Sequence, residues 1–164
     1  MRKNPLVIAV VAVLLSGICA PRAHAQEDRA AILATVQLFF DALAESDTVA
    51  GRNAVLLDGQ YFRLREGDAG FDLSRVTHRE FLRSLPEGDD ALLERMWEPT
   101  VLQHGRMAVV WTPYDFHING VFSHCGVDVF NLKRTENGWR IAGIMYTVEL
   151  ADCAPSPLGP PGAD

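Results

Sequence analysis

The sequence has little positive charge and lacks the motifs of several large functional classes. Its 164 residues include 15 Lys and Arg against 21 Asp and Glu, for a formal net charge of −6. Nucleic acid and anionic membranes repel a chain with this balance. It contains no phosphate-binding glycine loop, no G-x-S-x-G nucleophile elbow and no basic strip interleaved with aromatic residues. These absences argue against nucleotide hydrolysis, serine-hydrolase chemistry and nucleic-acid binding.

Long hydrophobic runs are also absent, apart from one stretch near the N-terminus. It extends from Leu6 to Leu15, follows two basic residues, and is shorter than the about 20 residues that span a membrane. Ala23-His24-Ala25 has the small-x-small pattern of a cleavage site, so residues 1–25 are interpreted as a signal peptide. Lipidation at Cys19 is the alternative, but Ser16-Gly17-Ile18 fits a lipidation box poorly. The pattern predicts a secreted or periplasmic protein with no membrane attachment after processing.

Cysteine is scarce, with three in the whole chain. Cys125 and Cys153 lie beyond the predicted cleavage site, and an exported chain meets an oxidising compartment in which thiols usually pair. A disulfide between these two is therefore predicted. The alternative is a catalytic Cys125 beside His124, but adjacent residues of a strand point to opposite faces of the sheet.

The length remaining after cleavage is that of one ordinary domain. This domain is assigned to residues 26–153, and the Pro- and Gly-rich tail at residues 154–164 is predicted to be disordered. Removal of the basic residues of the signal segment makes the mature chain more acidic still. The organisation expected is one core and one flexible end.

The first part of the domain is patterned as helices. From Glu27 to Glu45, apolar residues recur at three- and four-residue steps, as on an amphipathic helix: Ile32, Val36, Phe39, Phe40 and Leu43. A second, short helix is predicted through Val49 and Val55 as far as Asp58-Gly59. A third starts at a capping box, Thr77 with Glu80, and stops before Pro86.

The rest of the domain is patterned as strands separated by turns. Asn-Gly is the strongest short hairpin signal, because both residues tolerate positive φ. It occurs at Asn119-Gly120 and Asn137-Gly138, and Gly105-Arg106 marks a further turn. These turns predict a four-stranded meander with strands at Leu92–Gln103, Met107–Ile118, Val121–Leu132 and Trp139–Leu150.

The two Asn-Gly turns set a register if each is a two-residue loop. Asp115 then lies opposite His124, and Asp128 lies opposite both Trp111 and Thr147 on its two neighbouring strands. The face that these residues share is polar at one end and apolar at the other, which predicts a core that opens into a pocket. The ligand-binding residues predicted for this pocket are Trp111, His117, Met145, Thr147 and Glu149.

The opposite face of the predicted sheet is too apolar to be left in water. Helices can cover only one of the two faces, so the other needs a different cover. A second subunit that packs sheet against sheet would supply it, and a homodimer is expected. The residues predicted on this face are Val110, Tyr114, Phe116, Val127, Val129, Ile144, Tyr146 and Val148.

The chain resembles a known superfamily in its order of helices and in its strand motifs. The motifs are W-x-P-Y-D-F-H-x-N-G from Trp111, S-H-C-G-V-D-V-F from Ser123, then G-W-R-I and Y-T. With the N-terminal helices, they resemble the nuclear transport factor 2-like superfamily, in particular its SnoaL-like, polyketide-cyclase-like and lumazine-binding branch. The resemblance implies an α+β fold, a cone-shaped curved antiparallel sheet with N-terminal helices packed over it, enclosing a pocket, and usually a dimer.

The resemblance does not choose a reaction. Members include dehydratases, isomerases, epoxide hydrolases and cyclases, as well as proteins with no assigned reaction, and fold alone does not determine function. Their acids and bases occupy differing positions, so no catalytic set carries over residue by residue.

Three residues are candidates for acid–base catalysis. Asp115 and His124 are predicted cross-strand neighbours, in which a carboxylate can orient and charge an imidazole; the alternative is a structural hydrogen-bonded pair. Asp128 is a candidate buried general base, as ketosteroid isomerases of this superfamily use an Asp. The alternative for Asp128 is a structural hydrogen bond to Thr147 or to a helix residue such as Asn53.

The sequence thus favours an exported small-molecule-binding domain. No H-E-x-x-H or similar ligand spacing is present, so no metal and no cofactor are expected. The first alternative is a cofactor-independent enzyme of the same fold, acting as a dehydratase, isomerase or cyclase through Asp115, His124 and Asp128. The second is a structural or interaction module whose cavity is filled by its own side chains.

Overall fold

The computed structural model describes residues 20–67, 70–85 and 89–162. Most of the predicted signal peptide, residues 1–19, lies outside the described residues, and the first helix begins ahead of the predicted cleavage site. The elements, in chain order, are α1 (Ala20–Ala44), α2 (Thr48–Ala54), β1 (Val55–Gly67), β2 (Gly70–Thr77), α3 (His78–Ser84), β3 (Leu92–Met96), β4 (Thr100–His104), β5 (Met107–Ile118), β6 (Val121–Thr135) and β7 (Gly138–Val148).

Helices α2 and α3 begin where local sequence signals place them, whereas α1 begins at Ala20, ahead of the predicted start at Glu27. Asp47 caps α2 by accepting hydrogen bonds from the backbone N–H groups of Val49 and Ala50, at 2.8 and 2.9 Å. The predicted capping box of Thr77 and Glu80 is present at the start of α3. None of the helices in the described part of the chain is long and apolar enough to cross a membrane.

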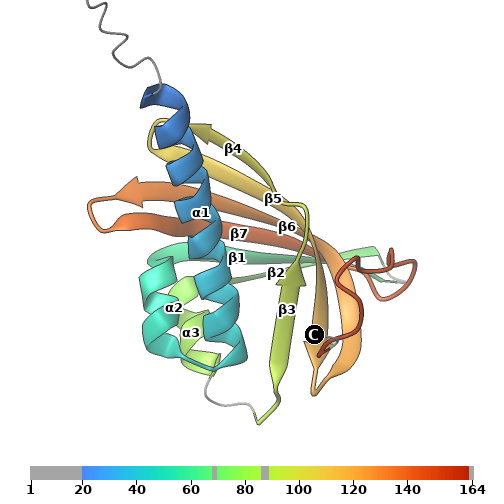
Figure 1. Ribbon diagram of the computed structural model, residues 1–164. Helices are drawn as coiled ribbons and strands as arrows, with labels where there is room; N and C mark the ends of the chain where they lie inside the picture. The colour runs from blue at the N-terminus through green and yellow to red at the C-terminus, as the bar shows by residue number, and fades with distance from the viewer. Residues whose placement is uncertain (1–19, 68–69, 86–88, 163–164) are drawn as a thin grey trace, which may run out of the picture.

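One curved sheet contains all seven strands of the described ranges. Its order is β2-β1-β7-β6-β5-β3, with β4 also paired to β5, and every pair is antiparallel except β1 with β7. The three helices lie on one side of this sheet, with α1 running across β5, β6 and β7 (Figure 1). The predicted α+β architecture, helices packed over a curved, mostly antiparallel sheet, is confirmed.

The core fills the space between α1 and the sheet. The predicted apolar stripe of α1 is buried, from Ile32 at 0% exposed to Leu43 at 4%. Phe39 and Phe40 both meet the ring of Phe130 edge-on, with ring centroids 6.3 and 5.7 Å apart. We call this helix-facing side of the sheet the inner face, and the other side the outer face.

The predicted end of the second helix and the predicted continuity of strand 92–103 are wrong. The second helix ends at Ala54 rather than near Gly59, because Val55 has an extended backbone and pairs with Ile141 of β7. The predicted strand 92–103 is two strands, β3 and β4, interrupted where Glu98 has a φ of +47°. In both places pairing with a distant strand overrides the local pattern.

The predicted register between β5 and β6 is wrong by one residue over most of its length. The Asn119-Gly120 turn has the predicted positive φ values, 53° and 76°, and next to it Ile118 pairs with Val121. The register then shifts between Phe116 and His117, so that Phe116 pairs with His124 and Asp115 pairs with Cys125. Ser123 is the extra residue of a β-bulge. This bulge turns His124 to the opposite face from Asp115.

The register between β6 and β7 differs from the prediction as well. The turn residues are Glu136 and Asn137 rather than Asn137-Gly138, and Thr135 pairs with Gly138. A second shift occurs between Asn131 and Leu132, and beyond it Asp128 pairs with Tyr146 instead of the predicted Thr147. The two shifts together redistribute the polar residues between the inner and outer faces.

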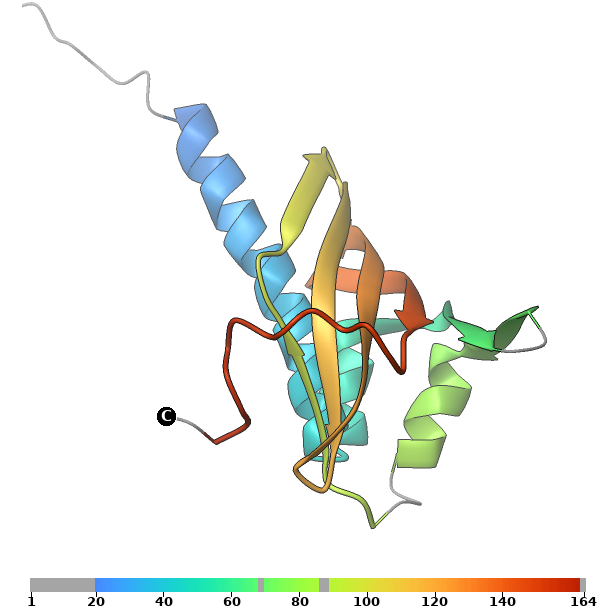
Figure 2. The ribbon, with the colours of Figure 1, turned by 90° about the vertical axis from the view of Figure 1, so that its right-hand side faces the viewer.

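The outer face is partly covered by the C-terminal tail. The predicted disulfide between Cys125 and Cys153 is present and joins β6 to this tail. From there the tail, which forms no helix or strand as far as Gly162, runs across the β3, β5 and β6 side of the sheet (Figure 2). The carbonyl oxygen of Gly159 accepts a 2.9 Å hydrogen bond from Arg95 of β3.

Candidate functional site

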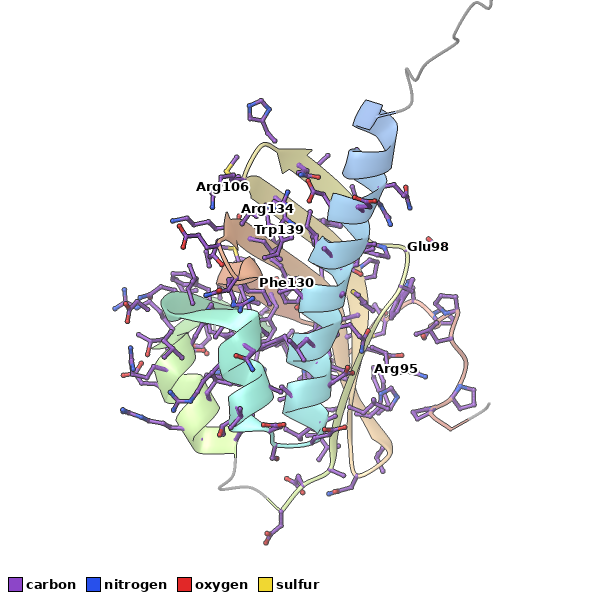
Figure 3. The ribbon with its side chains drawn as sticks, turned by 60° about the vertical axis from the view of Figure 1, so that its left-hand side comes forward. Arg95, Glu98, Arg106, Phe130, Arg134 and Trp139 are labelled. Carbon is purple, nitrogen blue, oxygen red and sulfur yellow. A yellow bond between two sulfur atoms is a disulfide. The ribbon has the colours of Figure 1, made fainter. Side chains whose placement is uncertain are left out.

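A cavity of about 280 Å³ lies between the helices and the inner face, open at one end. The lower bound for pockets that take small molecules is about 300 Å³, so it suits a compact ligand. Its lining comes from α1, from α3 and the residues that follow it, and from strands β1, β3, β5, β6 and β7. The lining residues are Leu43, Tyr61, Phe81, Ser84, Leu85, Asp90, Leu92, Glu94, Tyr114, Phe116, His124 and Tyr146. Phe130 and Trp139 lie on this same side of the sheet, next to α1 (Figure 3).

A buried acid pair meets the cavity through one of its members, Glu94, which belongs to the lining, whereas Asp128 lies behind it. Glu94 of β3 and Asp128 of β6 are 7% and 2% exposed, and their side chains are hydrogen-bonded to one another. Burial raises the pKa of Glu94 to about 7, although the hydrogen bond with Asp128 lowers it. Burial and then the charge of Glu94 raise the pKa of Asp128 well above its usual range. The raised pKa favours the protonated form of Asp128, which then donates a hydrogen bond to Glu94.

The acid pair is not fully satisfied by the protein. The Oδ2 atom of Asp128 is buried and has no hydrogen-bond partner among the described residues. A buried polar atom without a partner costs about 1–3 kcal/mol, and such atoms in native proteins commonly mark a functional position. The proton shared with Glu94 is therefore the interaction that offsets the burial of this carboxyl group.

Three tyrosines surround the acid pair and give the walls their shape. Tyr61 stacks on Phe81 at 4.7 Å and meets Tyr146 edge-on at 5.1 Å. The hydroxyl of Tyr114 donates a 2.6 Å hydrogen bond to the carbonyl oxygen of Thr147. Burial raises the pKa of all three, that of Tyr146 to about 12. They are neutral hydroxyl groups on an apolar wall.

A glycine makes room for one of these tyrosines. Gly126 is the register partner of Tyr114, and a Cβ atom at this position would clash first with the carbonyl oxygen of Thr147 and would also lie 2.9 Å from Cε1 of the Tyr114 ring. Any side chain at position 126 would displace the ring and its hydrogen bond to Thr147. The position of the Tyr114 hydroxyl thus depends on a residue with no side chain.

His124 is the imidazole of the cavity wall. Its ring stacks on Phe116 at 4.9 Å and meets Tyr114 edge-on at 5.8 Å, and its Nδ1 is 3.0 Å from the Ser123 hydroxyl. Burial lowers the pKa of His124, and Arg65 and Arg63 lower it further. At neutral pH the ring is therefore uncharged.

The structure does not bring the three predicted catalytic residues together. His124 and Asp128 are on the inner face, whereas Asp115 is on the outer face, where Arg95 holds it through two hydrogen bonds of 2.9 and 2.6 Å. His117 lies beside it, with Nδ1 3.7 Å from the Asp115 carboxylate. The predicted Asp115–His124 pair does not form, because the bulge at Ser123 places their side chains on opposite sides of the sheet.

The predicted ligand-binding residues lie on the outer face. Trp111 and Met145 are 54% and 45% exposed and, with Thr147, line a shallow depression of about 120 Å³. The Thr147 hydroxyl donates to the Glu149 carboxylate at 3.2 Å. His117 is buried in a second hollow, of about 310 Å³, under the C-terminal tail. A role of these residues in ligand binding stays a prediction.

Sequence reasoning overlooked Glu94, although the chain carries a signal for it. Alternation in a strand places Leu92, Glu94 and Met96 on one face. An ionisable residue between two large apolar ones on the same face is a candidate for burial, and burial is what raises its pKa. The proximity of Tyr61 and Tyr146 could not be predicted for a different reason. It depends on the pairing of β1 with β7, which come from opposite ends of the domain sequence.

Metal ligation has no geometric support in the described ranges. No group of three or more His, Cys, Asp or Glu side chains there is arranged to hold a metal ion. The acid pair supplies two carboxyl groups that share a proton, which is the arrangement of a hydrogen-bonding or proton-transferring site.

Comparison with known proteins identifies the fold and no closer relationship. No family model matches the sequence, and no curated protein matches it. A nuclear transport factor 2 (NTF2-like) superfamily protein from Salmonella enterica superposes with a TM-score of 0.62 at 12% identity, over 79% of this chain and 96% of that one. An NTF2-like protein with a cystatin-like fold from Novosphingobium aromaticivorans gives 0.61 at 19%, over 81% and 88%. The fold is NTF2-like. A third such protein, from Cytophaga hutchinsonii, gives 0.62 at 14% identity over 73% and 97%.

The outer face of this NTF2-like domain retains exposed apolar side chains. Trp111 and Met145 are about half exposed, and Val127 and Val129 beside them are partly buried. Several residues predicted for the dimer surface, including Tyr114 and Ile144, are instead buried under the helices. The homodimer stays a prediction, and the surface available for it is the one around Trp111.

Proposed function

We propose that this protein binds a small, uncharged or weakly polar group at Glu94 and an apolar body against the surrounding tyrosine and phenylalanine rings. The observation that carries this proposal is a buried acid pair, one member of which, Glu94, lines an open, aromatic-lined cavity. A filled core has no need of two carboxyl groups, whose burial costs several kcal/mol per ion unless a proton is shared. The cavity provides what the bound group needs, an apolar enclosure with few directed hydrogen bonds.

Binding can be measured with N-phenyl-1-naphthylamine, a neutral aromatic probe whose fluorescence rises in apolar surroundings. The protein is expected to bind it, and Ser84→Trp is expected to weaken binding at least about tenfold, because Ser84 is exposed at the cavity wall and an indole there fills the opening. Arg83→Trp is the matched control on the same helix, at an exposed position outside the lining. Equal probe affinity in the two variants would contradict the proposal, and native mass spectrometry of the purified protein would reveal a retained natural ligand.

A cofactor-independent proton-transfer enzyme is the second candidate function. It is favoured by the pKa of about 7 for Glu94, since a general base works best when its pKa is near the working pH. In this candidate Glu94 removes a proton from a carbon next to a carbonyl group, and Asp128 donates a hydrogen bond to Glu94. His124 is placed in the same wall.

Proton removal can be detected without knowing the natural substrate. Small cyclic ketones incubated with the protein in deuterated water should exchange their α-hydrogens faster than in buffer, as followed by proton NMR. Glu94→Gln should abolish this acceleration, with a loss of about 10²- to 10⁴-fold. Acceleration that persists in Glu94→Gln would assign the base elsewhere, and binding of the neutral probe by the same variant would show an intact cavity.

We also propose that the protein functions outside the cytoplasm. The pattern of residues 1–25 supports a signal peptide, and the Cys125–Cys153 disulfide supports an oxidising compartment. The N-terminal sequence of the protein recovered from the periplasm or the medium tests this proposal. It should begin at Gln26.

A further inference from the structure

One side of the cavity wall continues into a basic stripe on β1. Residues two apart in a strand share a face, so Arg63 and Arg65 follow Tyr61 along the inner face. Arg63 is the register partner of Tyr146, whose ring lines the cavity. The stripe therefore begins beside the cavity wall, on the side away from α1.

The guanidinium of Arg63 is only partly satisfied. Its Nη2 donates to Asp72 at 3.3 Å, in an ion pair whose side chains are 41% and 65% exposed. Its Nε is buried and has no hydrogen-bond partner within the described ranges. A guanidinium is a planar fork of donors that matches a carboxylate or sulfonate, and a free buried N–H on it is a position for an acceptor.

The positive charge of this stripe reaches the cavity wall. Both arginines lower the pKa of His124, although burial has the larger effect on it. Arg63 also lowers the pKa of Tyr146, but burial raises that pKa by more. Because the His124 ring is uncharged, the positive charge that acts on this part of the cavity wall comes from Arg63 and Arg65. At Glu94, the hydrogen bond with Asp128 and the raised pKa values of both groups leave less negative charge than two carboxylates would carry.

Arg63 lies outside the cavity lining but next to Tyr146, so the cavity and the stripe beside it offer two chemically different groups, Glu94 and the arginine. An aromatic enclosure lies between them, formed by Tyr61, Phe81, Phe116 and Tyr146. A ligand that satisfies both groups has an anionic group at one side, a flat apolar body and a neutral polar group at the other.

We propose that the ligand class is an aromatic or similarly flat organic acid, whose anionic group is bound by Arg63 while its neutral polar group reaches Glu94. Arg65 adds positive charge at longer range. This inference rests on the proposed function, because it names the ligand of the same cavity.

A pair of probes that differ by one anionic group tests this directly. 1-Anilinonaphthalene-8-sulfonate carries the ring system of N-phenyl-1-naphthylamine with a sulfonate added. The protein should bind the sulfonate probe more tightly than the neutral one. Arg63→Gln should weaken sulfonate binding about tenfold, the equivalent of one charge-assisted hydrogen bond, and leave binding of the neutral probe within about twofold.

Two further variants separate this effect from general changes in charge. Arg75→Gln makes the same charge change on β2 at an exposed position, where Arg75 pairs with Phe62 and so lies on the opposite face from Arg63. It should leave both affinities unchanged. Asp72→Asn removes the carboxylate that occupies Arg63 and should strengthen binding of the sulfonate probe a few-fold.

The possible outcomes distinguish this inference from the proposed function. Unchanged sulfonate affinity in Arg63→Gln, with neutral-probe binding intact and blocked by Ser84→Trp, overturns the role of Arg63 and leaves the cavity as a binding site. An equal loss in Arg75→Gln and Arg63→Gln also overturns it, because net charge would then explain the loss. Absence of binding of either probe to the unmodified protein overturns the proposed function and this inference together.

Discussion

Glu94→Gln is expected to be more stable than the unmodified protein at pH 8 by about 3 kcal/mol, the equivalent of a shift in pKa from 4.5 to about 7. The folded pKa of Glu94 is raised, so the folded state binds more protons than the unfolded state between these two values. The free energy of unfolding therefore falls as pH rises from about 4.5 to about 7. Glutamine keeps the shape of the Glu94 side chain and its amide oxygen can accept the hydrogen bond from Asp128. It carries no charge that would have to be buried.

Urea unfolding at pH 5 and pH 8 measures this effect. The unmodified protein should lose stability between the two pH values, and Glu94→Gln should lose much less. Glu45→Gln, at an exposed position directly after α1, is the control. Its stability should change with pH as that of the unmodified protein does. Parallel behaviour of all three proteins would show that Glu94 titrates in the folded state as it does in the unfolded chain.

A gain in stability from removing one carboxyl group would bear on function. Most substitutions of buried residues destabilise, and those that stabilise often lie at sites where activity requires an unfavourable arrangement. Loss of α-hydrogen exchange in the same variant would connect the destabilising group with catalysis. Loss of stability in its place would assign Glu94 a structural role.

Loss of the disulfide is expected to lower the free energy of unfolding by roughly 3 kcal/mol, the effect of releasing a loop of this length in the unfolded chain. Cys125 and Cys153 are 28 residues apart in sequence, and Cys125 is nearly buried in β6. Urea unfolding with and without reductant measures the loss. The intact mass should rise by two hydrogens on reduction.

The double variant Cys125→Ser and Cys153→Ser is the control. It should have the stability of the reduced protein and should not respond to reductant. A reductant effect that persists in this variant would have a cause other than the disulfide. Equal stability of the oxidised and reduced proteins would show that the link constrains only the tail and leaves the sheet unaffected.

The fold was predictable because its signals are local and repeated. The stripe from Ile32 to Leu43 has helical spacing and is buried, the capping box at Thr77 forms, and the strand Met107–Ile118 has the predicted bounds. Asn119-Gly120 forms the predicted turn. Each of these features is decided by a few neighbouring residues, whose preferences agree with the tertiary structure.

The site was predictable only in part, because it depends on two register shifts. Alternation assigns every residue of a strand to a face once the register is fixed, and a single extra residue reverses the assignment beyond it. The bulge at Ser123 separates Asp115 from His124, and the shift after Asn131 separates Asp128 from Thr147. Ser123 has no glycine or proline beside it that would mark the bulge, whereas Gly143, the partner of Asn131, does lie at the second shift. His124 still lines the cavity, and Asp128 is hydrogen-bonded to Glu94, a lining residue that the sequence analysis did not single out.

The parallel pairing of β1 with β7 has a consequence for how the protein is made. Residues 55–65 bond to residues 141–148, and α1 packs on strands that follow it by more than sixty positions in the chain. Contacts between such distant segments slow folding, because the intervening loop must close before they form. On the ribosome, the helices and the β1–β2 hairpin emerge well before their partner strand. A nascent chain of this topology cannot complete its sheet until its synthesis is nearly finished, which is compatible with the export proposed above.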